Sequence, residues 1–331
     1  MKSRKINNKT LRMNNTDDND NKQRNKQKTK SHGKNNKSKK SSNNIENELF
    51  RAERVVSTRA SISRSEAASA ITSRKVAYKE SEDDPALIPI KTTKLKIPMN
   101  AIIYMNGQPL PPIPPSLIVY HKPKNVLSAM EEKRTDRKHL GMLLPETYKK
   151  FGMHPVGRLD YDTTGLILFS RNGDLTQRLL HPKYNIEKEY VATVAGGIVD
   201  IDSLKKKLEV DGVETTEGIH FATIKDVQSL DSKQSQSILR KYMRNLNVEG
   251  VEERDLRIVS AAENENEQLF NIRLVVQEGK YRMVRRMLAN CNHPVVELKR
   301  ERHGVIELND LKVGAFRDCT VEELQWANNL L

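Results

Sequence analysis

The proline-rich segment "PLPPIPPS" at residues 109–116 constrains the fold more than any other feature of this 331-residue sequence. Proline has no backbone N–H and fixes its own φ angle, so this segment can form neither a helix nor an inner strand of a sheet. It stays extended and separates the residues before it from those after it. We therefore expect two folded domains, at residues 46–108 and 117–331, joined by a linker at 109–116.

Residues 1–45 precede both domains and differ in composition from the rest of the chain. Residues 1–44 hold 14 basic side chains, three acidic ones and no aromatic one, a net charge of +11 against +14 for the whole chain. Such a polar segment cannot bury enough apolar surface to offset its ordering entropy, so we expect a disordered basic tail. The tail either keeps the protein soluble, or binds nucleic acid or targets the nucleus.

The sequence favours an intracellular protein. Its two cysteines, Cys291 and Cys319, provide neither a disulfide framework nor the spacing of metal ligands. No run approaches the ~20 apolar residues that span a membrane, and no secretory segment follows Met1. We expect no membrane partner. The cytoplasm, the nucleus and an organelle all stay open as the compartment.

Local patterns predict a small α+β unit at residues 46–108. Ser63 and Glu66 have the spacing of a helix capping box at the start of "SRSEAASAI". The segments "KVAY" and "AIIYMNG" alternate between apolar and polar residues as short strands do, with Asn106-Gly107 as a turn.

Residues 117–331 mix strands with helices, which indicates a strand-rich α+β domain. The expected strands are "LIVYHKP", "GLILFS", "EKEYVATVAGG", "LFNIRLVVQEGK" and the closing "PVVELKRERHGVIEL". "DLTQRLLHP" predicts a helix with Asp174 as its N-cap. "YRMVRRMLANCN" predicts an amphipathic helix whose arginines lie largely away from its apolar face. Residues 226–266 are polar and are expected to form an insertion between two strands.

The segment "GRLDYDTTGL" at residues 157–166 places two carboxylates and an arginine among small or apolar residues. Three interpretations compete: a surface ion pair of little energetic value, a D-x-D-x-T phosphate-transfer motif, or a nucleophilic aspartate held by its neighbours. A phosphate-transfer aspartate requires a buried strand before it, whereas here "HPVGRL" precedes it and the apolar strand follows. Gly157 and Gly165 bracket the segment and allow the backbone to approach another group closely.

The segment resembles the motif G-R-L-D-x-x-T-x-G-L of the RNA pseudouridine synthases, and the chain is similar to their ribosomal RNA enzymes of the RsuA type. "YHKPKNVLS", "GDLTQRLLHP", "EKEYVATV" and "EGKYRMVRRMLA…VVELKRERHGVIEL" all fall in the family's order, so the resemblance covers residues 117–325. It implies a strand-rich α+β catalytic domain with a mixed or antiparallel sheet. "ISRSEAASAITSRKVAY" also fits the small RNA-binding module of the family, the α-L motif, although the preceding "RAERVVSTRA" is more polar than the family's helix there.

The resemblance implies an enzyme that isomerises uridine to pseudouridine in RNA, with ribosomal RNA as the expected substrate. It also implies that the chemistry needs neither a metal nor a redox cofactor, and we expect a monomer. The bond between uracil N1 and the ribose breaks, the base turns, and it rejoins through C5. Because a stacked base cannot react, the target nucleotide must first be flipped out.

Three residues match the catalytic positions of the family. Asp160 matches the catalytic aspartate, which acts as a nucleophile or stabilises charge on the sugar; whether it attacks the ribose or the base stays open. Tyr190 matches the tyrosine that stacks on the flipped uracil and can take the C5 proton. Arg285 matches the basic residue that pairs with the aspartate, and such a pair is expected to lower the pKa of the carboxyl group. Asp162 falls at a variable position of the motif.

Four further residues match binding positions rather than catalytic ones. These residues are Arg158, Lys280, Arg286 and Leu298. The three basic ones are expected to contact the RNA backbone, and Leu298 to pack against the base, although the same residues also fit solvated charges and a core leucine. Many relatives have His-Gln where this chain has Arg282-Met283. The rival function is that of a catalytically inactive RNA-binding or ribosome assembly factor.

Overall fold

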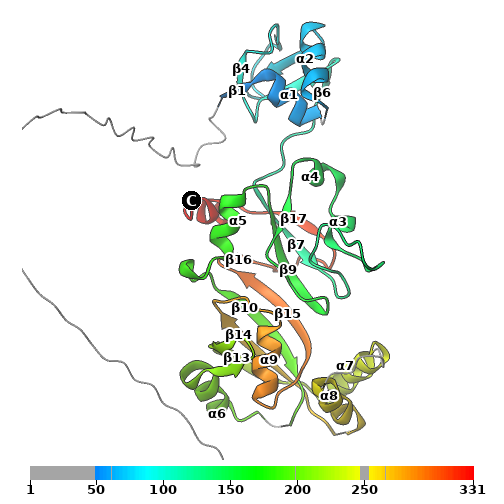
Figure 1. Cartoon of the computed structure of the whole chain (residues 1–331), viewed down its shortest axis with the longest axis vertical. Coiled ribbons are helices and arrows are strands. Elements are labelled where there is room, and N and C mark those ends of the chain that lie inside the picture. Colours follow the sequence, from blue (N-terminus) through cyan, green and yellow to red (C-terminus); the bar gives the residue numbers. More distant parts are fainter. Residues whose placement is uncertain (1–48, 61, 198, 247–252, 265) are drawn as a thin grey trace, which may run out of the picture. The chain divides into compact units, whose positions relative to one another are not determined.

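The computed structural model of the chain describes residues 49–60, 62–197, 199–246, 253–264 and 266–331 (Figure 1). The tail predicted at residues 1–45 lies outside these residues. Within the described part, no helix combines the length and the apolar character that crossing a bilayer requires.

Residues 49–113 form a small unit with its own core. Its elements are β1 (Leu49–Arg51), α1 (Ala52–Ala60), α2 (Arg64–Thr72), β2 (Val76–Lys79), β3 (Ile88–Pro89), β4 (Lys96–Pro98), β5 (Ile102–Met105) and β6 (Gln108–Pro109). The order β3-β2-β5-β6 makes one antiparallel sheet, and β1 pairs with β4. The predicted capping box of α2 is present, since the Ser63 Oγ accepts from the Glu66 N–H and the Glu66 carboxylate accepts from the Ser63 N–H.

Helix α1 forms from the polar segment "RAERVVSTRA" because its few apolar residues share one buried face with Arg59. The Arg59 side chain is only 4% exposed. It donates hydrogen bonds to the carbonyl oxygens of Ala101 at 2.7 Å and Pro111 at 2.7 Å, which satisfies its buried donors. Ile113 also packs against the core of the small unit. The first residues of the proline-rich segment therefore belong to this unit instead of linking it to the next.

Residues 117–331 build the mixed sheet expected of a strand-rich α+β domain. The strand order is β13-β14-β10-β15-β9-β7-β17, with β8 on β9 and β16 on β15. The strands are β7 (Leu117–Lys122), β8 (His154–Val156), β9 (Thr163–Ser170), β10 (Lys188–Val194), β13 (Thr223–Ser229), β14 (Phe270–Val276), β15 (Val295–His303), β16 (Ile306–Glu307) and β17 (Phe316–Asp318). Within this sheet β9 and β15 run parallel, and the other strand pairs of the described residues are antiparallel.

Strands β7 and β9 are neighbours in this sheet, and both of their faces are covered. Ile167 and Phe169 point into one core and Leu166 and Leu168 into another, where they meet α5 (Gly173–Leu180) and α10 (Val321–Asn328). The sequence of a strand that is buried on both faces is a continuous apolar run, which explains the pattern "GLILFS".

The parallel contact between β9 and β15 depends on Gly165. This glycine has φ +108°, and a Cβ atom there would lie 2.2 Å from the carbonyl oxygen of Arg300 on β15. No other residue allows the two backbones to come so close. Gly165 thus sets the distance between β15 and the turn that precedes β9.

The remaining helices and strands surround the sheet. They are α3 (Leu140–Leu143), α4 (Glu146–Lys150), α6 (Ile201–Lys205), β11 (Val213–Thr215), β12 (Gly218–His220), α7 (Ser232–Arg244), α8 (Glu253–Glu263) and α9 (Met283–Asn290). Two sequence predictions are corrected here. The N-cap of α5 is Asn172 rather than Asp174, because the Asn172 side chain accepts from the Leu175 N–H. The insertion predicted at residues 226–266 starts later, since Thr223–Ser229 forms an edge strand of the sheet.

Candidate active site

Asp160 lies on a tight turn between β8 and β9. The Thr163 N–H donates to the Asp160 carbonyl oxygen at 3.1 Å and closes the turn. The preceding residue is held from both sides, because the Ser128 hydroxyl accepts from the Leu159 N–H at 3.0 Å and donates to the Leu159 carbonyl at 2.7 Å. These contacts present a carboxylate whose side chain is 21% exposed.

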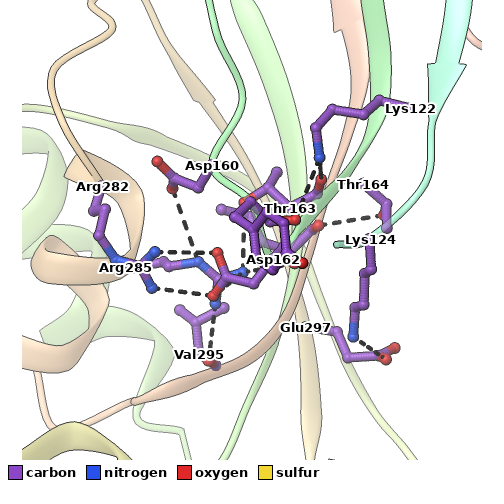
Figure 2. A network of polar contacts seen from close by, with 12 residues as sticks. Lys122, Lys124, Asp160, Asp162, Thr163, Thr164, Arg282, Arg285, Val295 and Glu297 are labelled. Carbon is purple, nitrogen blue, oxygen red and sulfur yellow. Dashed lines mark hydrogen bonds and ion pairs between the residues drawn. The ribbon is translucent and has the colours of Figure 1, made fainter. Parts of the chain in front are cut away.

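A buried lysine supports the turn from below. The Lys122 side chain, at the end of β7, has no exposed surface. Its Nζ donates to the carbonyl oxygens of Thr163 at 2.9 Å, Pro123 at 3.0 Å and Tyr161 at 3.4 Å (Figure 2). Burial lowers the pKa of Lys122 to about 8, while the charges of Asp162 and Asp160 act in the opposite direction. Lys122 thereby fixes backbone groups on both sides of Asp162.

Arg285 reaches the same turn from α9, and only 4% of its side chain is exposed. The prediction that the arginines of this helix lie largely away from its apolar face is wrong for Arg285, which is one of the buried residues of α9. Its guanidinium donates to the carbonyl oxygens of Val295 at 3.1 Å and Asp162 at 3.2 Å. Its Nε lies 4.0 Å from the Asp160 Oδ2 (Figure 2).

Asp162 makes the closest ion pairs of the site, although it occupies a variable position of the motif. Arg282 binds it with both terminal nitrogens, at 3.1 Å and 3.0 Å, and the Arg285 Nη2 lies 3.2 Å from its Oδ2. Arg282 precedes α9 in the left-handed region, with φ 50°. A non-glycine residue adopts this region at a cost in backbone strain. The bidentate ion pair with Asp162 offsets that strain.

The electrostatics of Asp160 differ from the sequence expectation. Burial raises the pKa of this carboxyl group above its ordinary value, and the negative charge of Asp162 adds to the rise. Arg282 and Arg285 lower the pKa, as expected of Arg285, but they do not cancel the effect of burial. The site therefore holds a carboxylate that is incompletely solvated and close to two guanidinium groups.

Tyr190 and Leu298 lie on one face of the sheet beside this turn. Tyr190 on β10 is 8% exposed and Leu298 on β15 is 3% exposed, and both belong to the core that also contains Leu159 and Met283. Leu298 pairs in register with Thr163, so it is adjacent to the turn. Among the described residues, neither side chain has a hydrogen bond or an ion pair with Asp160.

The three basic residues expected to bind the RNA backbone lie at the surface or near it. Arg158 and Lys280 are exposed. Arg286 donates to the Thr216 hydroxyl at 2.9 Å, and its guanidinium lies 5.0 Å from the centre of the Tyr281 ring. Within the described part of the chain, none of the three has a hydrogen bond or an ion pair with Asp160. Within the helix, Arg285 turns inward and Arg286 outward.

We expect Asp162→Asn to retain most of the turnover and to move the acid side of its pH profile to lower pH. The asparagine keeps one acceptor oxygen for Arg282, and it removes the negative charge that raises the pKa of Asp160. A lower pKa keeps Asp160 ionised at lower pH. Rate measurements across pH on folded variant and wild-type enzyme check this. A loss of turnover as complete as that of Asp160→Asn would assign the essential carboxylate to Asp162.

Comparisons with known proteins place this chain in one class, that of enzymes which isomerise uridine in RNA. The RNA pseudouridylate synthase family model matches residues 116–290. The chain belongs to this family. It is 30% identical over 225 residues to the ribosomal large subunit pseudouridine synthase B of Bacillus subtilis, a match that covers 67% of this chain and 75% of the relative.

A second relative and one solved structure are also similar to this chain. The ribosomal small subunit pseudouridine synthase A of Vibrio vulnificus is 28% identical over 235 residues, covering 71% of this chain and 83% of the relative. The crystal structure of a pseudouridylate synthase is similar to this chain with a TM-score of 0.46 and 22% identity, covering 85% of this chain and 100% of the other.

Proposed function

We propose that this enzyme converts uridine to pseudouridine in ribosomal RNA, with Asp160 as the nucleophile. The observation that supports this most is the position of Asp160 within "GRLDYDTTGL", on a turn held by Lys122 and beside the buried guanidinium of Arg285. The names of the relatives support ribosomal RNA as the substrate.

The proposed reaction needs only groups that this site holds. Asp160 attacks the ribose or the base, and the bond between uracil N1 and the ribose breaks. The uracil turns, a bond forms between its C5 and the ribose, and the C5 proton leaves with Tyr190 as its acceptor. The bond between Asp160 and the ribose or the base breaks in the course of these steps, which regenerates the free carboxylate. Arg285 keeps the half-buried Asp160 ionised in the RNA complex, where further desolvation would favour protonation.

Binding of the flipped nucleotide involves the other residues matched to the family. Leu298 packs against the base, as an apolar residue beside the turn can. Arg158, Lys280 and Arg286 contact the phosphates that flank it. We further propose that residues 49–113 bind RNA next to the target, and that the enzyme works as a monomer.

Incubating the purified full chain with ribosomal RNA from cells that lack the gene tests this function. Pseudouridine is then detected by carbodiimide modification and primer extension. We expect it at one or a few defined uridines. Ribosomal RNA that gains none under conditions where the protein binds it would contradict the proposal.

We expect deletion of residues 1–44 to reduce the salt dependence of RNA binding, with kcat on saturating RNA nearly unchanged. The tail carries a net charge of +11, and each phosphate contact contributes about 0.7 to the slope of log K against log salt for single-stranded RNA. Titrations at several salt concentrations measure that slope. An identical slope with and without the tail would show that the tail does not bind RNA.

A further inference from the structure

Helix α7, in the insertion between β13 and β14, carries four basic residues and no acidic one over Ser232–Arg244. The side chains of Lys233, Arg240 and Arg244 are exposed. At 3.6 residues per turn these three lie within an arc of about 40° on the helix surface. We call them the α7 basic face.

The charges of this face do not serve the folding of the insertion. Helix α7 is held through its opposite side, where Leu239 packs with Ile258 of α8 and with Val296 of β15. The Ser235 hydroxyl, also buried, accepts from the Leu269 N–H at 3.0 Å. Lys233, Arg240 and Arg244 have no ion pair or hydrogen bond with any residue that the structure describes. Like charges on one helix face repel one another, and these three have no counter-ion among the described residues, so their proximity costs free energy.

Lys241 connects this helix to the candidate active site. Its Nζ lies 3.6 Å from the Glu297 Oε1, and the same oxygen receives a hydrogen bond from the Lys124 Nζ at 2.6 Å (Figure 2). Burial alone would raise the pKa of Glu297, but Lys124 and Lys241 lower it. The contacts of Glu297 with the two lysines are therefore ion pairs.

The two partners in this cluster, Lys124 and Glu297, are both close in the chain to residues that contact the turn carrying Asp160. Lys124 follows the supporting Lys122 by two residues. Glu297 precedes Leu298, whose carbonyl oxygen accepts from the Thr164 hydroxyl at 3.3 Å. The last turn of α7 is therefore fixed to the strands that build the site, and the basic face continues from there along the helix.

We propose that the α7 basic face is a second binding surface for the RNA substrate, which holds backbone phosphates beyond the target nucleotide. This inference rests on the proposed function for its partner. A polyanion such as RNA complements three exposed cations on one helix. An RNA strand whose target nucleotide occupies the active site continues beyond the edge of that site. The surface contacts phosphates and contributes affinity without selecting a base.

The test compares two triple variants of the full chain. The first is Lys233→Gln, Arg240→Gln and Arg244→Gln, which removes the α7 basic face but keeps the ion pair between Lys241 and Glu297. The second is Lys150→Gln, Lys183→Gln and Lys312→Gln, which removes three exposed charges elsewhere in the same domain. Binding to a 40-nucleotide single-stranded RNA of mixed sequence is measured at several salt concentrations, after circular dichroism has confirmed the fold of both.

We expect the α7 variant to bind RNA about 10-fold more weakly than wild type, with a salt slope smaller by about 2, as three lost phosphate contacts predict. The control variant should lose about 2-fold at most. With ribosomal RNA as substrate, the α7 variant should show a raised KM and an unchanged kcat. Equal losses in the two variants would overturn the proposal. An enzyme that forms no pseudouridine would refute the proposed function, while the binding comparison would still decide this inference.

Discussion

Asp160→Asn is expected to abolish pseudouridine formation and to leave RNA affinity within a few-fold of wild type. The amide has the shape of the carboxylate but cannot act as a nucleophile or stabilise a positive charge on the sugar. The turn should persist, because Lys122 and the Thr163 N–H hold it through backbone carbonyl oxygens. Release of tritium from RNA labelled at uracil C5, together with a binding titration, measures both quantities.

Asp174→Asn serves as the control for this change. Asp174 is an exposed aspartate in the first turn of α5, so the same substitution there should leave turnover unchanged. Pseudouridine formed by a pure Asp160→Asn preparation would show that the reaction does not depend on this carboxylate.

Arg285→Ala is expected to reduce turnover by orders of magnitude with little change in substrate binding. The side chain is buried and holds the carbonyl oxygens of Val295 and Asp162 as well as facing the Asp160 carboxylate. Removing one partner from a buried charge cluster typically costs about 3–5 kcal/mol. Without the guanidinium, the pKa of Asp160 should rise further and its position should loosen.

The effect of Arg285→Ala should not add to that of Asp160→Asn, because the two residues act as one unit. Thermal unfolding and the milder Arg285→Lys variant separate a loss of function from a loss of fold. Arg286→Ala is the neighbouring control. Arg286 contacts Thr216 instead of the aspartates, so its loss should appear mainly in RNA binding. Equal kcat for Arg285→Ala and wild type would remove Arg285 from the mechanism.

Elements that follow from local pattern were predictable from the sequence. The run "GLILFS" predicts a strand covered on both faces, as β9 is, and the spacing of Ser63 and Glu66 predicts the capping box that α2 has. Gly165 could be assigned a close backbone approach, although its partner, the Arg300 carbonyl on β15, could not be predicted without the strand order.

Contacts between distant polar residues were not predictable in this way. Arg59 lies in the polar segment "RAERVVSTRA", yet it is buried against carbonyl oxygens from another part of the small unit. The pair of Asp162 and Arg282 joins a variable motif position to a departure from the family's His-Gln, and nothing local connects the two. Lys122 in the otherwise apolar "LIVYHKP" was the one available signal of a buried ammonium group.

The direction of the pKa shift of Asp160 was likewise not predictable from the sequence. A sequence resemblance supplies the partner, Arg285, and with it the expectation of a lowered pKa. The degree of burial depends on how β8, β9 and α9 come together, and here burial has the larger effect. The sign of the shift follows from the folded structure alone.

Transcriptome-wide pseudouridine mapping in cells with and without the gene tests the central claim most directly. We predict that one or a few uridines of ribosomal RNA lose their pseudouridine signal when the gene is deleted. Wild-type enzyme should restore the signal, and Asp160→Asn expressed at the same level should not. A ribosomal RNA map that is identical in the two strains, or one that Asp160→Asn restores, would contradict the account.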